Sequence, residues 1–395
     1  MTPQYESEIE TTLAASSKGT LRQFVFYFLR LGTFGFGGPI ALAARMQKDL
    51  VEELGWISQE DYTEGLAFSQ LSPGPLAAQL AMYLGWVRFA NLGATLTGTF
   101  FILPSFLMVL GIAALYLHYG SLSSIQSIFY GVGSAVVAIL VRSAYKLTRT
   151  TLKTDSLLWV LFTVSAVATA WTKSEIIWLF VLCAIVSMIV KTRLRSAITA
   201  VLPAGLVWLT TGIHGPAGLN TGLGLFTFFL KAGAFVFGSG LAIVPFLYGG
   251  LVVQSHWLTE RQFLDAVAVA MITPGPVVIT AGFIGYLVAG PVGAVLAALA
   301  VFAPPYFIVL IAAPLYRRFT KNLYVNAFVK GVTAAAIGAI TGAVFILASR
   351  TLVDRNSILI AGASLGILSL TKKIPEPVLI LLAGLVGFVL LRATH

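Results

Sequence analysis

The sequence is poor in charge and in the residues that build metal and redox sites. Only 10% of its 395 residues are charged, and Cys183 is the one cysteine. A single cysteine excludes an internal disulfide and a thiol redox pair, and its apolar surroundings predict a small buried side chain. The four histidines are scattered singly along the chain. We therefore expect no metal site and no cofactor.

Apolar residues dominate instead. They make up 58% of the chain, the mean hydropathy is +0.91, and apolar runs recur along most of its length. Because these runs are continuous and do not alternate with period two, they indicate helices and not a barrel. We predict an all-α polytopic membrane protein. The net charge of +10 falls in short clusters between the runs, which is typical of topology-setting loops and not of a nucleic-acid site.

The chain contains an internal repeat. FLRLGTFGFGGP at 28–39 returns as FLKAGAFVFGSG at 229–240, with six of twelve positions identical and a displacement of 201 residues. The displacement becomes 200 from Gly85 and Gly285 onward. We predict two homologous repeats of about six helices each. The boundaries expected are an N-terminal tail over 1–20, a first repeat over 21–196, a linking transmembrane segment over 197–221 and a second repeat over 222–395.

Loop charges predict how the two repeats are oriented. The first half has no Lys or Arg between His118 and Ser124, whereas the matching loop of the second half carries three. The next pair of matching loops shows the opposite bias. By the positive-inside rule the repeats are inverted relative to each other, with the linking segment supplying the inversion and the N-terminus in the cytoplasm.

Each half carries a Pro-Gly-Pro motif within an apolar run, at Ser72–Pro75 and at Thr273–Pro276. Two prolines remove backbone donors, so a helix that reaches the motif must stop and restart. Counted from a predicted N-cap at Ser58, the first break lies about 20 Å along its helix, inside a hydrocarbon core about 30 Å thick. Unpaired backbone at that depth must be buried in protein or line a water-filled cavity. We predict proline-broken helices at the centre.

A restarted helix offers amide donors to an anion, because its N-terminus carries about half a positive charge. If the repeats are inverted, the two breaks face each other near the midplane and meet a tetrahedral dianion from both sides. Gln79, one turn beyond the first break, is a weaker candidate donor. The main candidates are the backbone of Gly74, Leu76, Ala77, Ala78, Gly275, Val277, Val278 and Ile279 and the hydroxyls of Ser72 and Thr273.

Glycine-rich stretches and interior cations add further candidates. Gly37 and Gly38, with Gly238 in the second half, allow close helix packing or close approach of a ligand, and so much glycine loosens or ends a helix. Arg30 and its counterpart Lys231 lie within apolar runs. A cation at such depth binds a ligand, or its long side chain reaches back to the membrane surface.

Each half also places one carboxylate in an apolar run, Glu64 in the first and Asp265 in the second. Two interpretations stand. The carboxylate takes up a proton during coupling, or it forms a structural ion pair with the cation of its own half.

These motifs resemble those of the chromate ion transporter family in its long form with two fused domains. The resemblance rests on FGFGGP at 34–39, the Trp56 loop, SPGP at 72–75 and their second copies, and it covers nearly the whole chain. It implies export of chromate, with sulfate as the related oxyanion, across a bacterial inner membrane. The residues implied by motif are Gly32, Phe34, Gly37, Gly38, Pro39, Ser72–Pro75 and Thr273–Pro276. Because Ser239-Gly240 replaces Gly38-Pro39, the domains are expected to contribute unequally.

We therefore expect a secondary transporter and not an enzyme, with chromate or sulfate and membrane lipid as partners and no nucleic acid. A homodimer is compatible with the sequence. The nearest alternative is an uptake transporter for sulfate or another oxyanion. An intramembrane enzyme acting on a lipid phosphate is disfavoured because the sequence shows no nucleophile paired with a base. A receptor is disfavoured because the polar parts are too short for a recognition domain.

Overall fold

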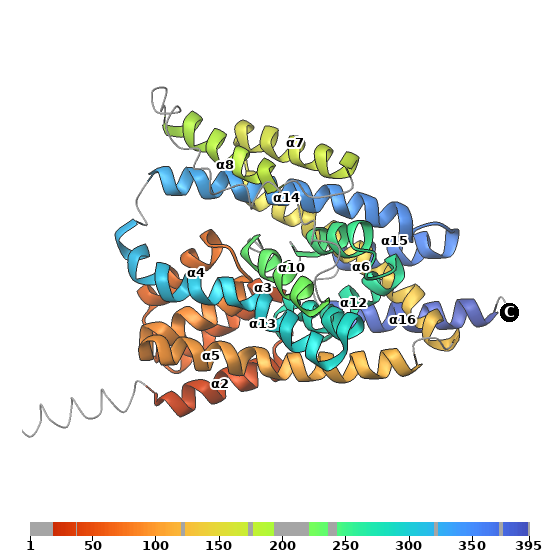
Figure 1. Ribbon diagram of the computed structural model, residues 1–395, viewed down its shortest axis with the longest axis horizontal. Coiled ribbons are helices and arrows are strands. Elements are labelled where there is room, and N and C mark those ends of the chain that lie inside the picture. Colours follow the sequence, from red (N-terminus) through yellow and green to blue (C-terminus); the bar gives the residue numbers. More distant parts are fainter. Residues whose placement is uncertain are drawn as a thin grey trace, which may run out of the picture.

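The computed structural model describes residues 19–36, 38–119, 123–172, 177–192, 221–235, 243–319, 323–370 and 374–393. The regular elements in these ranges are all helical (Figure 1). The predicted all-α membrane fold is thus confirmed. Apart from Thr221, the predicted linking segment over 197–221 lies outside the described residues. The described helices long and apolar enough to cross a membrane are Leu76–Tyr119, Ile125–Leu152, Val277–Pro314 and Asn326–Thr351.

The first two helices form a hairpin around the glycine-rich stretch. Its arms are α2 (Leu21–Phe34) and α3 (Gly38–Gln47), which continues as a π-helical segment (Lys48–Glu53). The hydroxyl of Tyr27 donates a hydrogen bond to Asp49 at 3.1 Å, so the arms lie side by side. The glycines, expected to loosen or end a helix, reverse the chain.

The first Pro-Gly-Pro motif is the turn of a second hairpin, formed by α4 (Gln59–Leu71) and the start of α5 (Leu76–Tyr119). The rings of Phe68 and Tyr83 lie 5.4 Å apart. In a helix that continued through the break they would be about 20 Å apart. Gly74 has a φ of +139°, a backbone conformation open to glycine that lets the chain turn back. The predicted break is confirmed, and its two arms run back alongside each other.

α5 reverses direction once more before it crosses the membrane. Phe89 and Ala90 leave the helical conformation, and Ala90 has a φ of +50°. The arm that precedes this turn packs so closely on the arm that follows it that a Cβ at Gly93 would lie 2.0 Å from the Gly85 oxygen. The long second arm of α5 is therefore a separate helix.

The second half repeats this arrangement. Its elements are α10 (Thr221–Phe235), α11 (Ile243–Tyr248) with a π-helical segment (Gly249–Gln254), α12 (Glu260–Ile272), a 3₁₀ turn (Val277–Ile279) and α13 (Thr280–Phe319). The rings of Phe228 and Trp257 lie 6.2 Å apart across the glycine-rich hairpin. α13 reverses at Ala289 and Gly290, the positions that match Phe89 and Ala90.

The remaining helices are exchanged between the halves. The hairpin of α7 (Ser156–Thr172) and α8 (Ile177–Thr192) packs against α14 (Leu323–Thr351) of the second half. Reciprocally, the hairpin of α15 (Arg355–Leu370) and α16 (Glu376–Ala393) packs against α6 (Ser123–Leu152) of the first half.

Matched glycines make this exchange possible. A Cβ at Gly331 of α14 would lie 2.6 Å from the Cys183 oxygen of α8, and one at Gly131 of α6 would lie 2.0 Å from the Ala383 oxygen of α16. Such reciprocal contacts define a two-fold relation, which is the relation expected of the predicted repeats. Cys183 is buried, as predicted.

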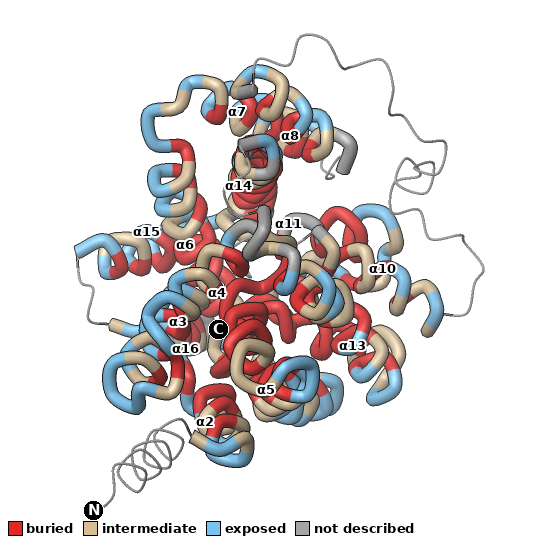
Figure 2. Tube along the Cα trace, turned by 90° about the vertical axis from the view of Figure 1, so that its left-hand side faces the viewer, coloured by how far each residue is buried: buried red, intermediate tan, exposed pale blue. Residues whose placement is uncertain are grey.

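Buried residues gather along the central helices, and the outer helices expose blue and tan faces (Figure 2). Exposed apolar surface of this extent is unfavourable in water and indicates contact with lipid. Large exposed apolar side chains include Leu103 and Leu107 on α5, Leu299, Phe307 and Ile311 on α13, and Leu385 and Val389 on α16.

Candidate functional site

The first Pro-Gly-Pro turn leaves a row of buried backbone donors. α4 ends where the Ser72 amide donates to the Phe68 oxygen at 2.9 Å, and α5 makes its first helical bond from the Gln79 amide to the Pro75 oxygen at 3.0 Å. The amides between these bonds have no hydrogen-bond acceptor among the described residues. They belong to Gly74, Leu76, Ala77 and Ala78. All four residues are buried, so amides left without an acceptor there are unfavourable and call for one.

The hydroxyls at the two turns are already engaged. Ser72 donates from Oγ to the Phe68 oxygen at 2.7 Å, and Thr273 donates from Oγ1 to the Ala270 oxygen at 3.2 Å. Short hydroxyl side chains at a helix end readily bond back to the preceding turn. This corrects the predicted role of Ser72 and Thr273 as free donors to an anion.

The second turn is closed by a contact with the first half. The Gly275 amide donates to the Gly35 oxygen in the glycine-rich turn at 3.0 Å. Gly275 is therefore a structural contact and not the free donor that was predicted. The chain then makes a 3₁₀ turn, with the Ile279 amide on the Pro276 oxygen at 3.0 Å. Of the predicted donors, Val277 is buried and its amide has no acceptor in the described ranges.

Each turn rests on the long helix of the opposite half. A Cβ at Gly74 would lie 2.6 Å from Cβ of Pro305 on α13, and one at Gly275 would lie 1.9 Å from Oγ of Ser105 on α5. Positions 105 and 305 match in the repeat and lie near the middle of the long second arms of α5 and α13. Ser105 also donates to the Gly32 oxygen at 3.4 Å. Both turns thus lie deep in the helical bundle.

The remaining predicted binding residues lie at different depths. Arg30 is exposed on α2, whereas Lys231 on α10 is half-buried. Gly38 begins α3 with a φ of +72° and has open space where a Cβ would stand. Gly37 and Gly238 lie outside the described residues.

Each predicted carboxylate lies beside a tyrosine of the opposite half. Asp265 is 4% exposed and accepts a hydrogen bond from the Tyr116 hydroxyl at 2.7 Å. Glu64 is close enough to act electrostatically on Tyr316. The Tyr316 ring packs at 5.1 Å on Phe68, one turn beyond Glu64. The two carboxylate–tyrosine pairs therefore cross between the repeats.

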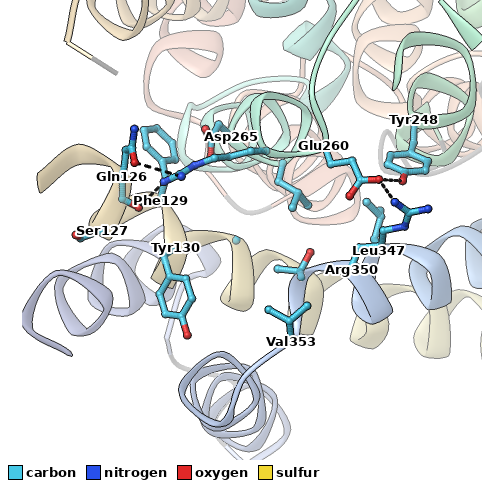
Figure 3. A pocket seen from close by; sticks show the side chains of 14 residues that line it. Gln126, Ser127, Phe129, Tyr130, Tyr248, Glu260, Asp265, Leu347, Arg350 and Val353 are labelled. Atoms are coloured by element: carbon cyan, nitrogen blue, oxygen red, sulfur yellow. Dashed lines mark hydrogen bonds and ion pairs between the residues drawn. The ribbon is translucent and has the colours of Figure 1, made fainter. Parts of the chain in front are cut away.

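A cavity of about 560 Å³ reaches Asp265 from the protein surface (Figure 3). Helices α6, α12 and α14 line it. Arg350 pairs with Glu260 on one side, and Glu260 also accepts a hydrogen bond from Tyr248 at 3.0 Å. Arg261 lines the same cavity and acts electrostatically on Asp265. The cavity thus places charged side chains of α12 and α14 beside a buried carboxylate.

A family model described as "Chromate transporter" matches residues 22–188 and again residues 223–388. The chain belongs to the chromate transporter family. The double match confirms two homologous halves. No solved structure matches the chain.

Curated relatives of the family align along most of the chain. A chromate transport protein of Cupriavidus metallidurans is 51% identical over 95% of this chain and 94% of its own. A probable chromate transport protein of Synechococcus elongatus is 49% identical over 94% and 95%, respectively. A chromate transport protein of Pseudomonas aeruginosa is 31% identical over 96% and 94%.

Within this chromate transporter family member, the crossed tyrosines are the site feature that sequence reasoning missed. The groups that act on the Asp265 carboxylate within the described chain are Tyr116 and Arg261, and Lys231 is not among them. The predicted ion pair within the second half is therefore not formed there. Tyr116 and Tyr316 stand 200 residues apart, so extending the repeat comparison to these positions would have found them.

Proposed function

We propose that this protein is a secondary transporter that exports chromate from the cytoplasm across a bacterial inner membrane, with sulfate as a second substrate. The N-terminus lies in the cytoplasm in this proposal, and the repeats extend over 21–196 and 222–395. The anion is held at the first Pro-Gly-Pro turn. The observation that carries this assignment is the row of buried, acceptor-free amides from Gly74 to Ala78.

Neutral amides suit a transporter better than a fixed cation. A helix N-terminus binds an oxyanion through aligned N–H groups and a partial positive charge of about half a unit. Because no full opposite charge is buried with the anion, release does not require separating an ion pair in a medium of low dielectric constant. The relatives at 51% and 49% identity are named as chromate transport proteins and not as enzymes, which supports the same reading.

Coupling in this proposal uses the buried carboxylates. Asp265 lines the cavity and accepts a hydrogen bond from the Tyr116 hydroxyl. In such surroundings the charged form of a carboxylate is costly, and binding a proton removes that cost. A buried carboxylate can therefore take up and release a proton during transport. Proton movement through Asp265, and through Glu64 in the other half, would then drive chromate against its gradient.

The test is uptake of radiolabelled chromate into proteoliposomes under imposed pH and voltage gradients, with sulfate as competitor. Leu76→Pro removes one donor while the first helical position tolerates proline. Val277→Pro makes the matched change at the closed turn. We expect Leu76→Pro to reduce chromate uptake strongly and Val277→Pro to reduce it less, at equal reconstituted amounts of folded protein.

Three outcomes would contradict this proposal. Equal uptake by the Leu76→Pro variant and the wild type would remove the first turn from the site. Uptake of sulfate with no competition by chromate would favour the uptake alternative. Transport in the inward direction alone, with the N-terminus shown to be cytoplasmic, would exclude export.

A further inference from the structure

Gln79 places a polar side chain inside the first turn. Its side chain is fully buried at 0% exposure, one helical turn beyond the break. A Cβ at Gly74 would lie 2.5 Å from Cδ and 2.6 Å from Nε2 of Gln79, so the carboxamide fills the space beside the acceptor-free amides.

The orientation of this carboxamide follows from its one hydrogen bond. Nε2 donates to the Pro73 oxygen at 2.6 Å. Because a backbone carbonyl can only accept, the NH₂ group must face Pro73, which leaves Oε1 on the other side. Oε1 is buried and has no hydrogen-bond partner among the described residues. A buried acceptor left unpaired is unfavourable, so it calls for a ligand or water that donates a proton.

The first turn therefore combines several donors with one acceptor. A fully deprotonated tetrahedral oxyanion carries acceptors only, and its oxygens would repel Oε1. A singly protonated oxyanion matches both kinds of group: its charged oxygens face the amides, and its hydroxyl can donate to Oε1. We propose that the first turn selects the singly protonated form of the substrate, hydrogen chromate, through a hydrogen bond from its hydroxyl to Gln79. This inference rests on the proposed function and specifies its substrate.

Such a site would separate chromate from sulfate. Hydrogen chromate loses its last proton near neutral pH, whereas sulfate holds no proton until the solution is strongly acidic. Sites built to bond a substrate hydroxyl reject analogues that lack it by factors of about 10⁴. The matched position in the second turn is Thr280, whose hydroxyl is satisfied by the Val277 oxygen at 2.6 Å. The second turn therefore has no equivalent of this unpaired acceptor.

Ionisable groups also lie on the helices that pack against α5, so the test must observe the ligand itself. These groups are titratable or charged side chains of the first arm of α5 and of the five helices packed against α5. In chain order they include Arg22, Tyr27, Arg30, Arg45, Tyr62, Glu64, Tyr83, Arg88, Arg261, Asp265, Tyr306 and Tyr316. Any of these could make binding depend on pH. Chromate and hydrogen chromate differ in their ultraviolet and visible absorption, which reports the protonation state of the bound ion directly.

The experiment measures the difference absorption spectrum and the dissociation constant of potassium chromate on the purified full-length protein, over a pH series from acid to alkaline. In alkaline solution, where free chromate is the dianion, we expect the bound ion to show the hydrogen chromate spectrum. The dissociation constant should rise about tenfold per pH unit once free chromate is deprotonated, beyond any change seen with sulfate. A bound spectrum identical to the dianion would overturn the proposal.

Two variants complete the test. Gln79→Met removes the acceptor, and we expect it to lose the hydrogen chromate spectrum and the steep dependence on pH. Thr280→Val makes the matched change at the second turn and should keep both. If Leu76→Pro abolishes chromate binding but wild-type binding does not change with pH, the site stands and the protonation inference fails. If Leu76→Pro binds as the wild type does, the proposed site itself fails.

Discussion

The two Pro-Gly-Pro turns share a motif and a depth but differ in what their backbone does. At the first turn the chain restarts as an α-helix, and its leading amides lack acceptors among the described residues. At the second turn Gly275 is bonded to Gly35 and a 3₁₀ turn follows. A buried glutamine follows one turn, and a threonine satisfied by its own backbone follows the other.

This difference shows how a duplicated motif can divide two roles. Both copies must reverse the chain, which two prolines around a glycine achieve by local chemistry. In the proposed function, the first copy keeps its donors for the ligand. The other holds the glycine-rich turn of the first half in place, so it stabilises the surroundings of the first. The unequal contribution expected from Ser239-Gly240 thus has a counterpart at the turns themselves.

The largest effect is expected from Gly275→Ala, which breaks the closed turn. The new Cβ would lie 1.9 Å from the Ser105 hydroxyl, and the φ of +93° disfavours any side chain by about 1–2 kcal/mol. We expect little folded protein by size-exclusion chromatography in detergent, and partial recovery when Ser105→Gly is added. Normal folding of Gly275→Ala alone would show that this turn does not fix the structure.

Next in size is Asp265→Asn, which tests the crossed carboxylate of the second half. We expect exchange of chromate down its own gradient to continue, while the acceleration by an imposed pH gradient is lost. Tyr116→Phe leaves Asp265 without its donor and should lower stability by about 1–3 kcal/mol without removing that acceleration. Vesicle uptake with and without a pH gradient separates the two variants. A full response in Asp265→Asn would exclude Asp265 from coupling.

Much of this fold could be predicted because the signals are local. Prolines end helices wherever they stand, and the predicted N-cap at Ser58 accepts the Asp61 amide at 3.0 Å. Hydropathy and the repeat identified the membrane class and the two halves. These features depend on residues close together in sequence, or on a comparison of the sequence with itself.

The rest required contacts between distant residues. Whether the first break turns back or continues depends on the φ of Gly74 and on the packing of Gly65 against Tyr83, which no local pattern encodes. The bond from Gly275 to Gly35 joins segments 240 residues apart. Candidate donors could be named from the sequence, but which of them are already bonded follows from the tertiary structure alone.

A smaller effect is expected where the two halves differ at the turn within α5 and α13. Ala90 adopts φ 50° and ψ −145°, a conformation suited to glycine, and the matched Gly290 adopts φ 64° and ψ −157°. Ala90→Gly should therefore raise the free energy of unfolding by about 1–3 kcal/mol, and Gly290→Ala should lower it by a similar amount. Thermal unfolding in detergent measures both. Changes of the same sign in the two variants would contradict this account.

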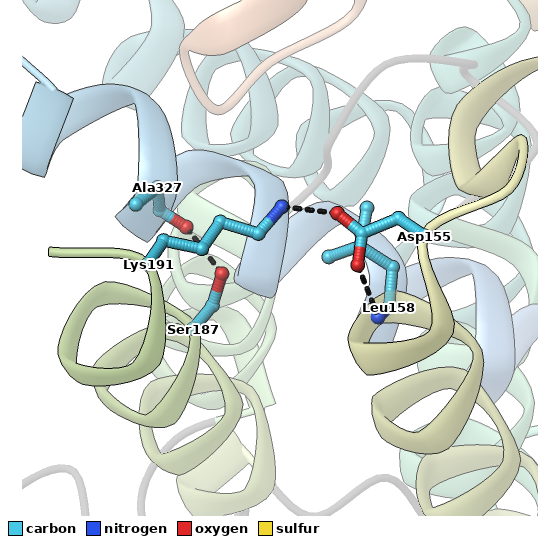
Figure 4. Close-up of polar contacts among 5 residues, drawn as sticks. All are labelled: Asp155, Leu158, Ser187, Lys191 and Ala327. Atoms are coloured by element: carbon cyan, nitrogen blue, oxygen red, sulfur yellow. Dashed lines mark hydrogen bonds and ion pairs between the residues drawn. The ribbon is translucent and has the colours of Figure 1, made fainter. Parts of the chain in front are cut away.

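The smallest effect on stability is expected from the ion pair in the α7–α8 hairpin, one of the two hairpins exchanged between the halves. Lys191 donates to Asp155 at 2.5 Å, and Leu158 donates its amide to the same carboxylate at 3.3 Å (Figure 4). The Lys191 ammonium holds the pKa of Asp155 below its ordinary value. The equivalent carboxylate before α15 is Asp354, which accepts the Ser357 amide at 2.8 Å and a hydrogen bond from the Tyr130 hydroxyl of α6 at 2.6 Å.

Because the pKa of Asp155 is depressed by folding, the pair stabilises the hairpin at neutral pH, and the contribution is lost as pH falls through the folded-state value. Both side chains are partly exposed, so Asp155→Asn should cost no more than about 1 kcal/mol. Ser187 also fastens the hairpin by donating to the Ala327 oxygen at 2.8 Å, a bond without a titrating group. We therefore expect the difference in unfolding temperature between wild type and Asp155→Asn to shrink in acid. The hairpin should remain packed on α14, because the Ser187 bond does not depend on pH. A difference that persists in strong acid would mean that packing, and not the ion pair, is what the substitution disturbs.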